Sequence, residues 1–212
     1  MASEGILHVE QHEAAQRAER QPVFYYDLSS PESYIAAERI GAVLGVVPEW
    51  QPVLASALPA GEVGVFRCAE ERLIHMAELE RRAAELEMQP LRFPADWPTD
   101  SEHAMRVATY AKQIGRVVAF SLAAFRQAFA AGRDLSDPDG VVIAAAACEM
   151  HPNAVLKAAG MRSIANALRA ATADAAARGV RSVPAVIGGG EVFHGDAGLE
   201  PAAGALAAGA AR

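Results

Sequence analysis

The sequence predicts an α/β fold in which a long helical block interrupts a small β-sheet. Residues 23–28 (V-F-Y-Y-D-L) are rich in aromatic and β-branched side chains, the composition of a buried strand. Far along the chain, two short apolar runs at 183–187 and 191–194 flank a glycine turn and predict a hairpin. Between these regions, apolar residues recur at helical spacing. With 212 residues, the chain suits one large domain or a core domain that contains an inserted one.

The first predicted strand leads directly into a helix start. Ser29, Ser30 and Pro31 follow it. A serine can cap a helix, and proline suits the first helical position because no amide donor is needed there. Helical spacing continues to Gly41, which can end the helix. Residues 46–53 (V-V-P-E-W-Q-P-V) then predict a second strand, and its two prolines indicate an edge position in the sheet.

The block between the strands is predicted to be helical, with two loops that interrupt the pattern. Residues 54–65 contain Pro59 and two glycines and predict a loop. Residues 90–98 (P-L-R-F-P-A-D-W-P) predict a rigid loop that holds Phe93 and Trp97 among three prolines. The expected helices lie near residues 73–86, 104–114, 118–129 and 137–149, after a cap at Asn153, and near residues 164–175.

The elements follow the order strand, helix, strand, helical block, helix, hairpin and final helix, which begins near Leu199. Neither half has enough strands to form a stable sheet alone, so both should join in one sheet. This is the layout of a thioredoxin-like fold with an inserted all-helical domain of roughly 100 residues. The predicted boundaries are a tail at 1–21, a thioredoxin-like domain at 22–66 and 166–212, and an inserted helical domain at 67–165.

Charge and composition exclude several classes of function. The net charge is −7, and no basic stripe offsets it, which argues against nucleic acid as a partner. No apolar run is long enough to span a membrane, and the first twenty residues lack the apolar centre of a signal peptide, so a cytoplasmic location is expected. Cys68 and Cys148 show no C-x-x-C or metal spacing and are expected to be small core residues. His75, His103 and His151 show no ligand spacing either; each is expected at the surface, and no metal site is predicted.

Ser30 is the first candidate for chemistry, because it stands where a strand enters a helix. Free backbone N–H groups and the positive end of the helix dipole make that point suited to an anion. The simpler alternative is a capping serine without further function. A serine hydroxyl is too weak an acid to ionise there, and no histidine is spaced to act as its base. A chemical role for Ser30 therefore means a hydrogen bond to an anion that another molecule supplies.

Four stretches of the chain are more specific. They are 26–36 (Y-D-L-S-S-P-E-S-Y-I-A), 92–98 (R-F-P-A-D-W-P), 128–137 (A-F-A-A-G-R-D-L-S-D) and 179–195 (G-V-R-S-V-P-A-V-I-G-G-G-E-V-F-H-G). Together they resemble the DsbA-like branch of the thioredoxin superfamily, and within it the 2-hydroxychromene-2-carboxylate isomerases and the kappa-class glutathione transferases. Disulfide-exchange members of this branch open the first helix with a C-P-x-C motif. Because Ser30 and Ser33 stand at the two cysteine positions, dithiol exchange is excluded there.

The resemblance implies glutathione as the cofactor. In the isomerase and kappa-type members, a serine that matches Ser30 faces the thiol of bound glutathione. Ser30 would donate a hydrogen bond to the thiolate, the helix start would stabilise it further, and Ser33 would complete this end of the cofactor site. Val183-Pro184 resembles the cis-proline loop of the superfamily, whose main chain pairs with the cysteinyl part of glutathione. An ordinary trans proline at the start of an edge strand is the alternative.

The loop after the predicted hairpin departs from the relatives. They commonly carry a G-x-D-R type loop that binds the γ-glutamyl end of glutathione, whereas residues 195–198 read G-D-A-G here. Two alternatives stay open. Either Asp196 takes this role with a shifted loop, or glutathione binds differently, weakly or not at all. His194 stands where these relatives often have an aromatic residue, and we expect a partly exposed hairpin histidine.

The activity implied by the resemblance is a glutathione-dependent cis-trans isomerisation of the 2-hydroxychromene-2-carboxylate type, with Ser30 as the catalytic residue and a small aromatic carboxylate as substrate. Trp97, Phe93 and Trp50 are candidates to line an apolar substrate pocket, although packing explains them equally well. The alternatives are a kappa-like transferase, which conjugates and does not expel the thiol, and a non-redox DsbA-like binding protein. The missing arginine favours the binding protein. Relatives of this kind are often homodimers.

Overall fold

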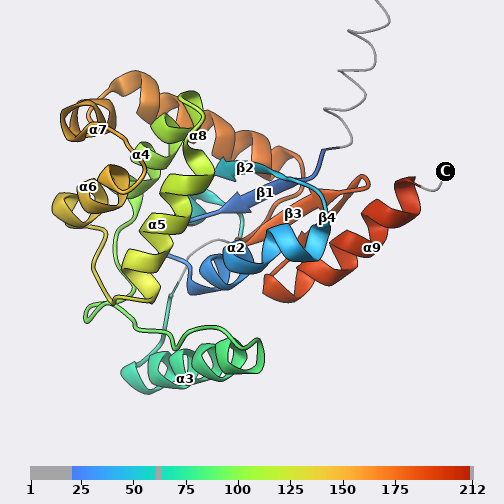
Figure 1. Cartoon of the computed structure of the whole chain (residues 1–212). Coiled ribbons are helices and arrows are strands. Elements are labelled where there is room, and N and C mark those ends of the chain that lie inside the picture. Colours follow the sequence, from blue (N-terminus) through green and yellow to red (C-terminus); the bar gives the residue numbers. More distant parts are fainter. Residues whose placement is uncertain (1–20, 61–63, 211–212) are drawn as a thin grey trace, which may run out of the picture.

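The computed structural model of the chain describes residues 21–60 and 64–210 and contains a four-stranded sheet with helices on both faces (Figure 1). The strands are β1 (Val23–Tyr26), β2 (Glu49–Pro52), β3 (Ala185–Gly188) and β4 (Glu191–His194), in the order β2-β1-β3-β4. β2 runs parallel to β1, whereas β3 is antiparallel to both β1 and β4. The prediction that the two halves of the chain share one sheet is therefore confirmed, as is the edge position of the proline-containing strand β2.

The side chains of β1 alternate between two hydrophobic cores. Phe24 and Tyr26 belong to the larger core, and Val23 and Tyr25 belong to the smaller one, as the two-residue period of a strand requires. The helices α2 (Pro31–Leu44) and α9 (Leu199–Ala210) cover one face of the sheet, and α8 (Arg162–Ala177) covers the other (Figure 1). All four residues of β1 are buried, which places this strand and the turn after it at the centre of the fold.

A block of helices lies between β2 and α8 in the chain. Its members are α3 (Ala69–Glu85), α4 (Glu102–Gln113), α5 (Val117–Phe129), α6 (Pro138–Ala146) and α7 (Pro152–Ala159). α4 packs against α5, α7 and α8, and the larger core runs through these helices to the sheet without a break. A hydrogen bond of 2.5 Å between the hydroxyl groups of Tyr26 and Ser121 joins β1 to α5. α3 lies apart from the others, on the side of α2 (Figure 1).

Most predicted elements occur, with local corrections. The predicted loop at 54–65 contains a short 3₁₀ helix, η1 (Ala55–Ala57). The predicted cap at Asn153 is wrong: Pro152 is already the first helical residue, and Nδ1 of His151 accepts the N–H of Asn153 at 3.2 Å. Cys148 is buried as expected, but Cys68 is exposed because it lies at the solvent-facing start of α3.

The boundaries predicted at 66/67 and 165/166 remain a prediction, and α8 begins slightly earlier, at Arg162. Residues 1–20 of the predicted tail lie outside the described part of the chain. Within residues 21–60 and 64–210, no helix combines the length and the apolar character that crossing a membrane requires. The same residues contain no cluster of histidine, cysteine and acidic side chains arranged for a metal ion.

Candidate functional site

The start of α2 is built by a short turn after β1. The N–H of Ser30 donates to the C=O of Asp27 at 3.1 Å, and Ser30 then adopts an extended backbone with φ −92° and ψ 114°. Pro31 takes the first helical position. Oγ of Ser30 accepts the N–H of Ser33 at 3.0 Å, which satisfies one of the free amide groups of the first turn. Ser30 is therefore the N-cap of α2, as the sequence predicted.

Asp27 holds this turn in place. Its Oδ1 accepts both the N–H and the hydroxyl of Ser29 at 2.9 Å, and its Oδ2 accepts the N–H of Ala55 at 2.9 Å. The residue is only 2% exposed, so these bonds replace the water that the carboxylate gives up on folding. The contacts fix the turn to η1, which follows β2. An aspartate two residues before a serine, here Asp27 and Ser29, is a recognisable turn pattern. It is the signal in the sequence that indicates this role of Asp27.

The hydroxyl groups of Ser30 and Ser33 are both closed off from solvent, since each residue is 0% exposed. Ser30 donates its hydroxyl proton to Oε2 of Glu32 at 3.1 Å. Oγ of Ser33 has no hydrogen-bond partner among the described residues. A buried hydroxyl without a partner typically lowers the stability of the fold by about 1–3 kcal/mol. A ligand that placed a hydrogen-bond acceptor beside Oγ of Ser33 would remove this cost. Contact between Ser30 and any ligand requires a neighbouring side chain to move.

Glu32 joins Ser30 to a histidine from another helix. Nε2 of His75, on α3, lies 3.1 Å from Oε1 of Glu32, so the two carboxylate oxygens bridge the serine and the imidazole. The hydrogen bond to Glu32 raises the pKa of His75, more than its partial burial lowers it. The imidazole ring also stacks against Trp97, with ring centroids 6.1 Å apart. His75 was expected at the surface. Its contact with Glu32 depends on tertiary packing, and no sequence signal indicates it.

Trp97 and Phe93 pack beside the start of α2. Nε1 of Trp97 donates to the C=O of Ser29 at 3.0 Å, and the two aromatic rings lie 5.1 Å apart. Phe66 contacts Trp97 as well, at 5.6 Å. Trp97 is only 1% exposed, so in this structure it acts as a packing residue, the alternative reading of its sequence position. The aromatic cluster nevertheless lies next to the candidate site, because Trp97 is bonded directly to its turn.

The Val183–Pro184 segment lies at the same end of the sheet as the start of α2. Its peptide bond is cis, as the resemblance implied. The segment immediately precedes β3, in which Ala185 pairs with Tyr25 of β1. Because β1 and β3 are antiparallel, the beginning of β3 lies beside the end of β1, where the chain turns toward Ser30. The C=O of Pro184 accepts the N–H of Gly195 at 2.8 Å, which links the segment to the loop after β4.

His194 is engaged within this hairpin. Its Nε2 accepts the N–H of Arg181 at 3.0 Å. Burial and the neighbouring Arg181 charge lower the pKa of His194, which favours the neutral ring that this bond requires. His194 is therefore a structural partner of the segment that leads to Val183.

Asp196 forms ion pairs with arginines from two other elements. Its Oδ2 lies 2.8 Å from Nε of Arg82 on α3 and 3.7 Å from Nη1 of Arg39 on α2. Asp196 opens the short 3₁₀ helix η2 (Asp196–Gly198), directly after the hairpin. The loop lacks its own arginine, but a guanidinium group from the helical block occupies the space beside its carboxylate. Neither contact was predicted, because the partners lie far away in the sequence.

A cavity of about 390 Å³ opens beside the turn that leads from β1 into α2. It borders Asp27 and Ser29 of the turn and Pro98, the residue after Trp97. Its lining is largely polar and comprises Asp27, Ser29, Ala55, Ser56, Gly64, Val65, Pro98, Thr99, Asp100 and Ser101. The cavity gives a small ligand room next to the start of α2.

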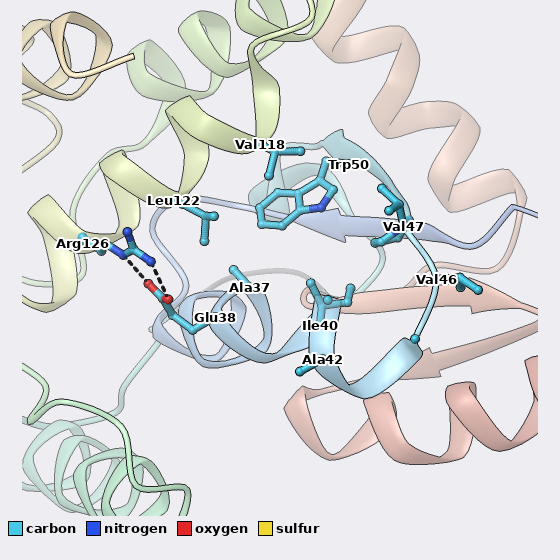
Figure 2. Close-up of a pocket in the computed structure, with 13 residues that line it drawn as sticks. Ala37, Glu38, Ile40, Ala42, Val46, Val47, Trp50, Val118, Leu122 and Arg126 are labelled. Carbon is cyan, nitrogen blue, oxygen red and sulfur yellow. Dashed lines mark hydrogen bonds and ion pairs between the residues drawn. The ribbon is translucent and has the colours of Figure 1, made fainter.

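A second cavity, of about 380 Å³, lies at the other end of α2 (Figure 2). Figure 2 shows Trp50 between Val118 and the rim formed by Val46 and Val47. Val47 is 78% exposed, so an apolar rim faces solvent. Trp50 was a candidate for the same substrate pocket as Trp97 and Phe93; the structure places it at this separate cavity instead.

Comparison with known proteins identifies the family. The sequence profile of the DSBA-like thioredoxin domain matches residues 23–207. The chain belongs to this family. A solved structure of 2-hydroxychromene-2-carboxylate isomerase is similar to this DSBA-like domain with a TM-score of 0.75 at 21% identity, covering 90% of this chain and 97% of the isomerase. A probable DsbA oxidoreductase from Streptomyces coelicolor has a TM-score of 0.73 at 19% identity, covering 91% of each chain. No curated protein sequence matches the chain.

These likenesses confirm the predicted DsbA-like thioredoxin fold. This DSBA-like domain has no cysteine in the first turn of α2, where Ser30 and Ser33 stand. Its two cysteines are free thiols: Cys68 lies at the start of α3, and Cys148 follows α6. The site therefore offers hydroxyl groups, a helix start and a paired carboxylate, and it depends on an external molecule for any thiol chemistry.

Proposed function

We propose that this DSBA-like domain binds glutathione at the start of α2 and catalyses a glutathione-dependent cis-trans isomerisation of a small aromatic carboxylate, of the 2-hydroxychromene-2-carboxylate type. The observation that carries the proposal is the placement of a serine cap, Ser30, and of the Val183–Pro184 segment at the same end of the sheet. The similar fold of a protein named 2-hydroxychromene-2-carboxylate isomerase supports it.

The residues present suit the three parts of glutathione. Ser30 and the unpartnered hydroxyl of Ser33 suit the sulfur, at the positive end of the helix dipole. The main chain of Val183 and Pro184 suits the peptide-like cysteinyl part. The γ-glutamyl end carries an ammonium and a carboxylate group, and Asp196 with Arg82 presents one charge of each sign. We therefore favour the alternative in which Asp196 takes this role, and we add Arg82 as the arginine beside it.

The chemistry follows from these positions. When bound, glutathione would supply a thiolate nucleophile for reversible addition to a conjugated double bond, which would permit rotation about that bond. Ser30 donates a hydrogen bond to the sulfur anion, and the first turn of α2 lowers the cost of its charge. For this, Ser30 must turn its hydroxyl proton away from Glu32, to which it donates now. The cavity beside Ser29 offers room for the substrate.

Two other functions remain as alternatives. A kappa-like transferase would use the same residues and release a conjugate. A binding protein without catalysis is favoured by one observation: Ser30 is fully buried and its hydrogen bonds are already those of a helix cap.

Two measurements test the proposal. Calorimetric titration should show glutathione binding, with weaker binding of S-methylglutathione because its sulfur cannot ionise. In an isomerisation assay, Ser30→Ala should lower kcat/KM by about a hundredfold, since it removes a donor to an anion. Asp137→Ala is the matched control, because Asp137 caps α6 before a proline in the same way and lies outside the site. An unchanged rate in Ser30→Ala would show that Ser30 is only a cap. Absence of glutathione binding would leave the binding protein as the better reading.

A further inference from the structure

One carboxylate connects the proposed sulfur site to the helical block. Oε2 of Glu32 accepts the hydroxyl of Ser30 at 3.1 Å, and its Oε1 lies 3.1 Å from Nε2 of His75. Glu32 is the acidic residue of the first turn of α2. It therefore lies at the same positive helix end that would stabilise a sulfur anion at Ser30.

Two anions at one helix start oppose each other. An ionised Glu32 next to Ser30 makes it harder for a bound thiol to lose its proton, since like charges disfavour ionisation. It also keeps the hydroxyl proton of Ser30 directed toward itself. A protonated His75 changes both effects, because it neutralises the carboxylate and weakens it as an acceptor.

The surroundings of His75 favour this protonated form. The hydrogen bond to Glu32 raises its pKa, and Glu78, on the same helix, acts in the same direction. The rings of Phe66 and Trp97, from the loops before and after α3, pack against the imidazole. The guanidinium of Arg72, on α3, donates to the C=O of Trp97 at 2.7 Å.

We propose that Glu32 and His75 together set the ionisation of the thiol held at Ser30, with opposite signs. Glu32 opposes the thiolate, and protonated His75 relieves that opposition. The inference rests on the proposed function, because it needs a thiol at Ser30. Both are positioning residues, since they act through the charge and the hydrogen bond that Ser30 experiences.

The test is a pH titration of the ultraviolet absorbance of the thiolate in glutathione bound to the full chain. Relative to the wild type, Glu32→Gln should lower the midpoint and His75→Gln should raise it, each by about one pH unit, a tenfold change in ionisation. The double variant should return close to the wild-type midpoint, because it removes a neutral pair. Glu80→Gln removes an exposed carboxylate from α3 and should leave the midpoint unchanged.

The opposite signs separate this role from a structural one. If both single variants shift the midpoint in the same direction, or neither shifts it while glutathione binds, the inference fails and the proposed function stands. If the wild type does not bind glutathione in the calorimeter, both fail together. Glu32→Gln preserves the shape of the side chain, so a midpoint that does not fall in this variant overturns the inference even if His75→Gln does not fold.

Discussion

The two ends of α2 border cavities of nearly equal volume, about 390 Å³ at the start and about 380 Å³ at the end, but they differ in chemistry. At the start, the buried side chains of Asp27 and Ser30 accept hydrogen bonds from the N–H groups of Ser29 and Ser33. At the end, Val46 and Val47 present apolar surface to solvent around Trp50. The comparison shows that cavity size does not locate chemistry. The candidate site lies at the end where the chain has buried polar groups, including the hydroxyl of Ser33, which has no partner among the described residues.

The largest expected effect lies at the apolar end. Trp50 is 4% exposed, and its ring lies 5.0 Å from Phe24 and 5.5 Å from Tyr26. Trp50→Ala should lower the free energy of unfolding by about 4 kcal/mol, because it removes a large buried side chain and leaves a void. Val47→Ala should change it by less than about 0.5 kcal/mol, since Val47 is exposed. Urea unfolding measures both. Equal losses would show that the rim is packed in solution.

Asp27→Ala tests the polar end by the same measurement. We expect a loss of about 3 kcal/mol, because two N–H donors and one hydroxyl donor lose their acceptor in a buried turn. Asp27→Asn should cost less, since its carbonyl oxygen still accepts hydrogen bonds. Equal stability of the wild type and Asp27→Ala would mean that water replaces these bonds, and the contrast between the two ends would disappear.

A smaller effect is expected from the cap itself. Ser30→Ala should destabilise the chain by about 1 kcal/mol, because the N–H of Ser33 loses its acceptor. Ser30→Gly should cost only a few tenths of a kcal/mol, since glycine is accepted at this position. Thermal unfolding at neutral pH resolves this difference. A loss above about 3 kcal/mol in Ser30→Ala would point to a wider structural role for the hydroxyl.

The smallest effect concerns pH. Contact with Glu32 raises the pKa of His75 in the folded chain, so its stabilising contribution is fully present below the unfolded pKa and is lost as pH rises through the folded pKa. The stability difference between wild type and His75→Gln should therefore be largest below about pH 6 and should shrink toward alkaline pH. It should stay under about 1 kcal/mol, because the His75 side chain is 34% exposed. A difference that grows with pH would contradict the ion pair.

The sequence predicted the architecture and one residue of the site well, for local reasons. The composition of residues 23–28 and the serine and proline that follow are short-range signals, and they placed β1, the start of α2 and the cap at Ser30 correctly. The end predicted at Gly41 is wrong, because α2 continues to Leu44 and Gly45 caps it. The cis bond at Val183–Pro184 was predicted because the surrounding residues resemble the cis-proline loop of the thioredoxin superfamily.

The contacts that complete the site were not predictable in this way. Glu32 with His75, and Asp196 with Arg82, are pairs between separate helices and loops, and nothing in the spacing of either partner indicates the other. Trp97 and Trp50 are alike as aromatic residues, yet one packs beside the turn of Ser29 and the other lines the distant cavity. Such differences arise only when the helical block is placed against the sheet.

The arginine beside Asp196 has a consequence for how sequences of this kind are compared. The two partners are separated by 114 positions in the chain, yet their charged groups lie 2.8 Å apart. A comparison that scores each loop on its own finds no arginine beside Asp196, although Arg82 of α3 places a guanidinium group next to it. Substitutions at these two positions should therefore occur together among homologues.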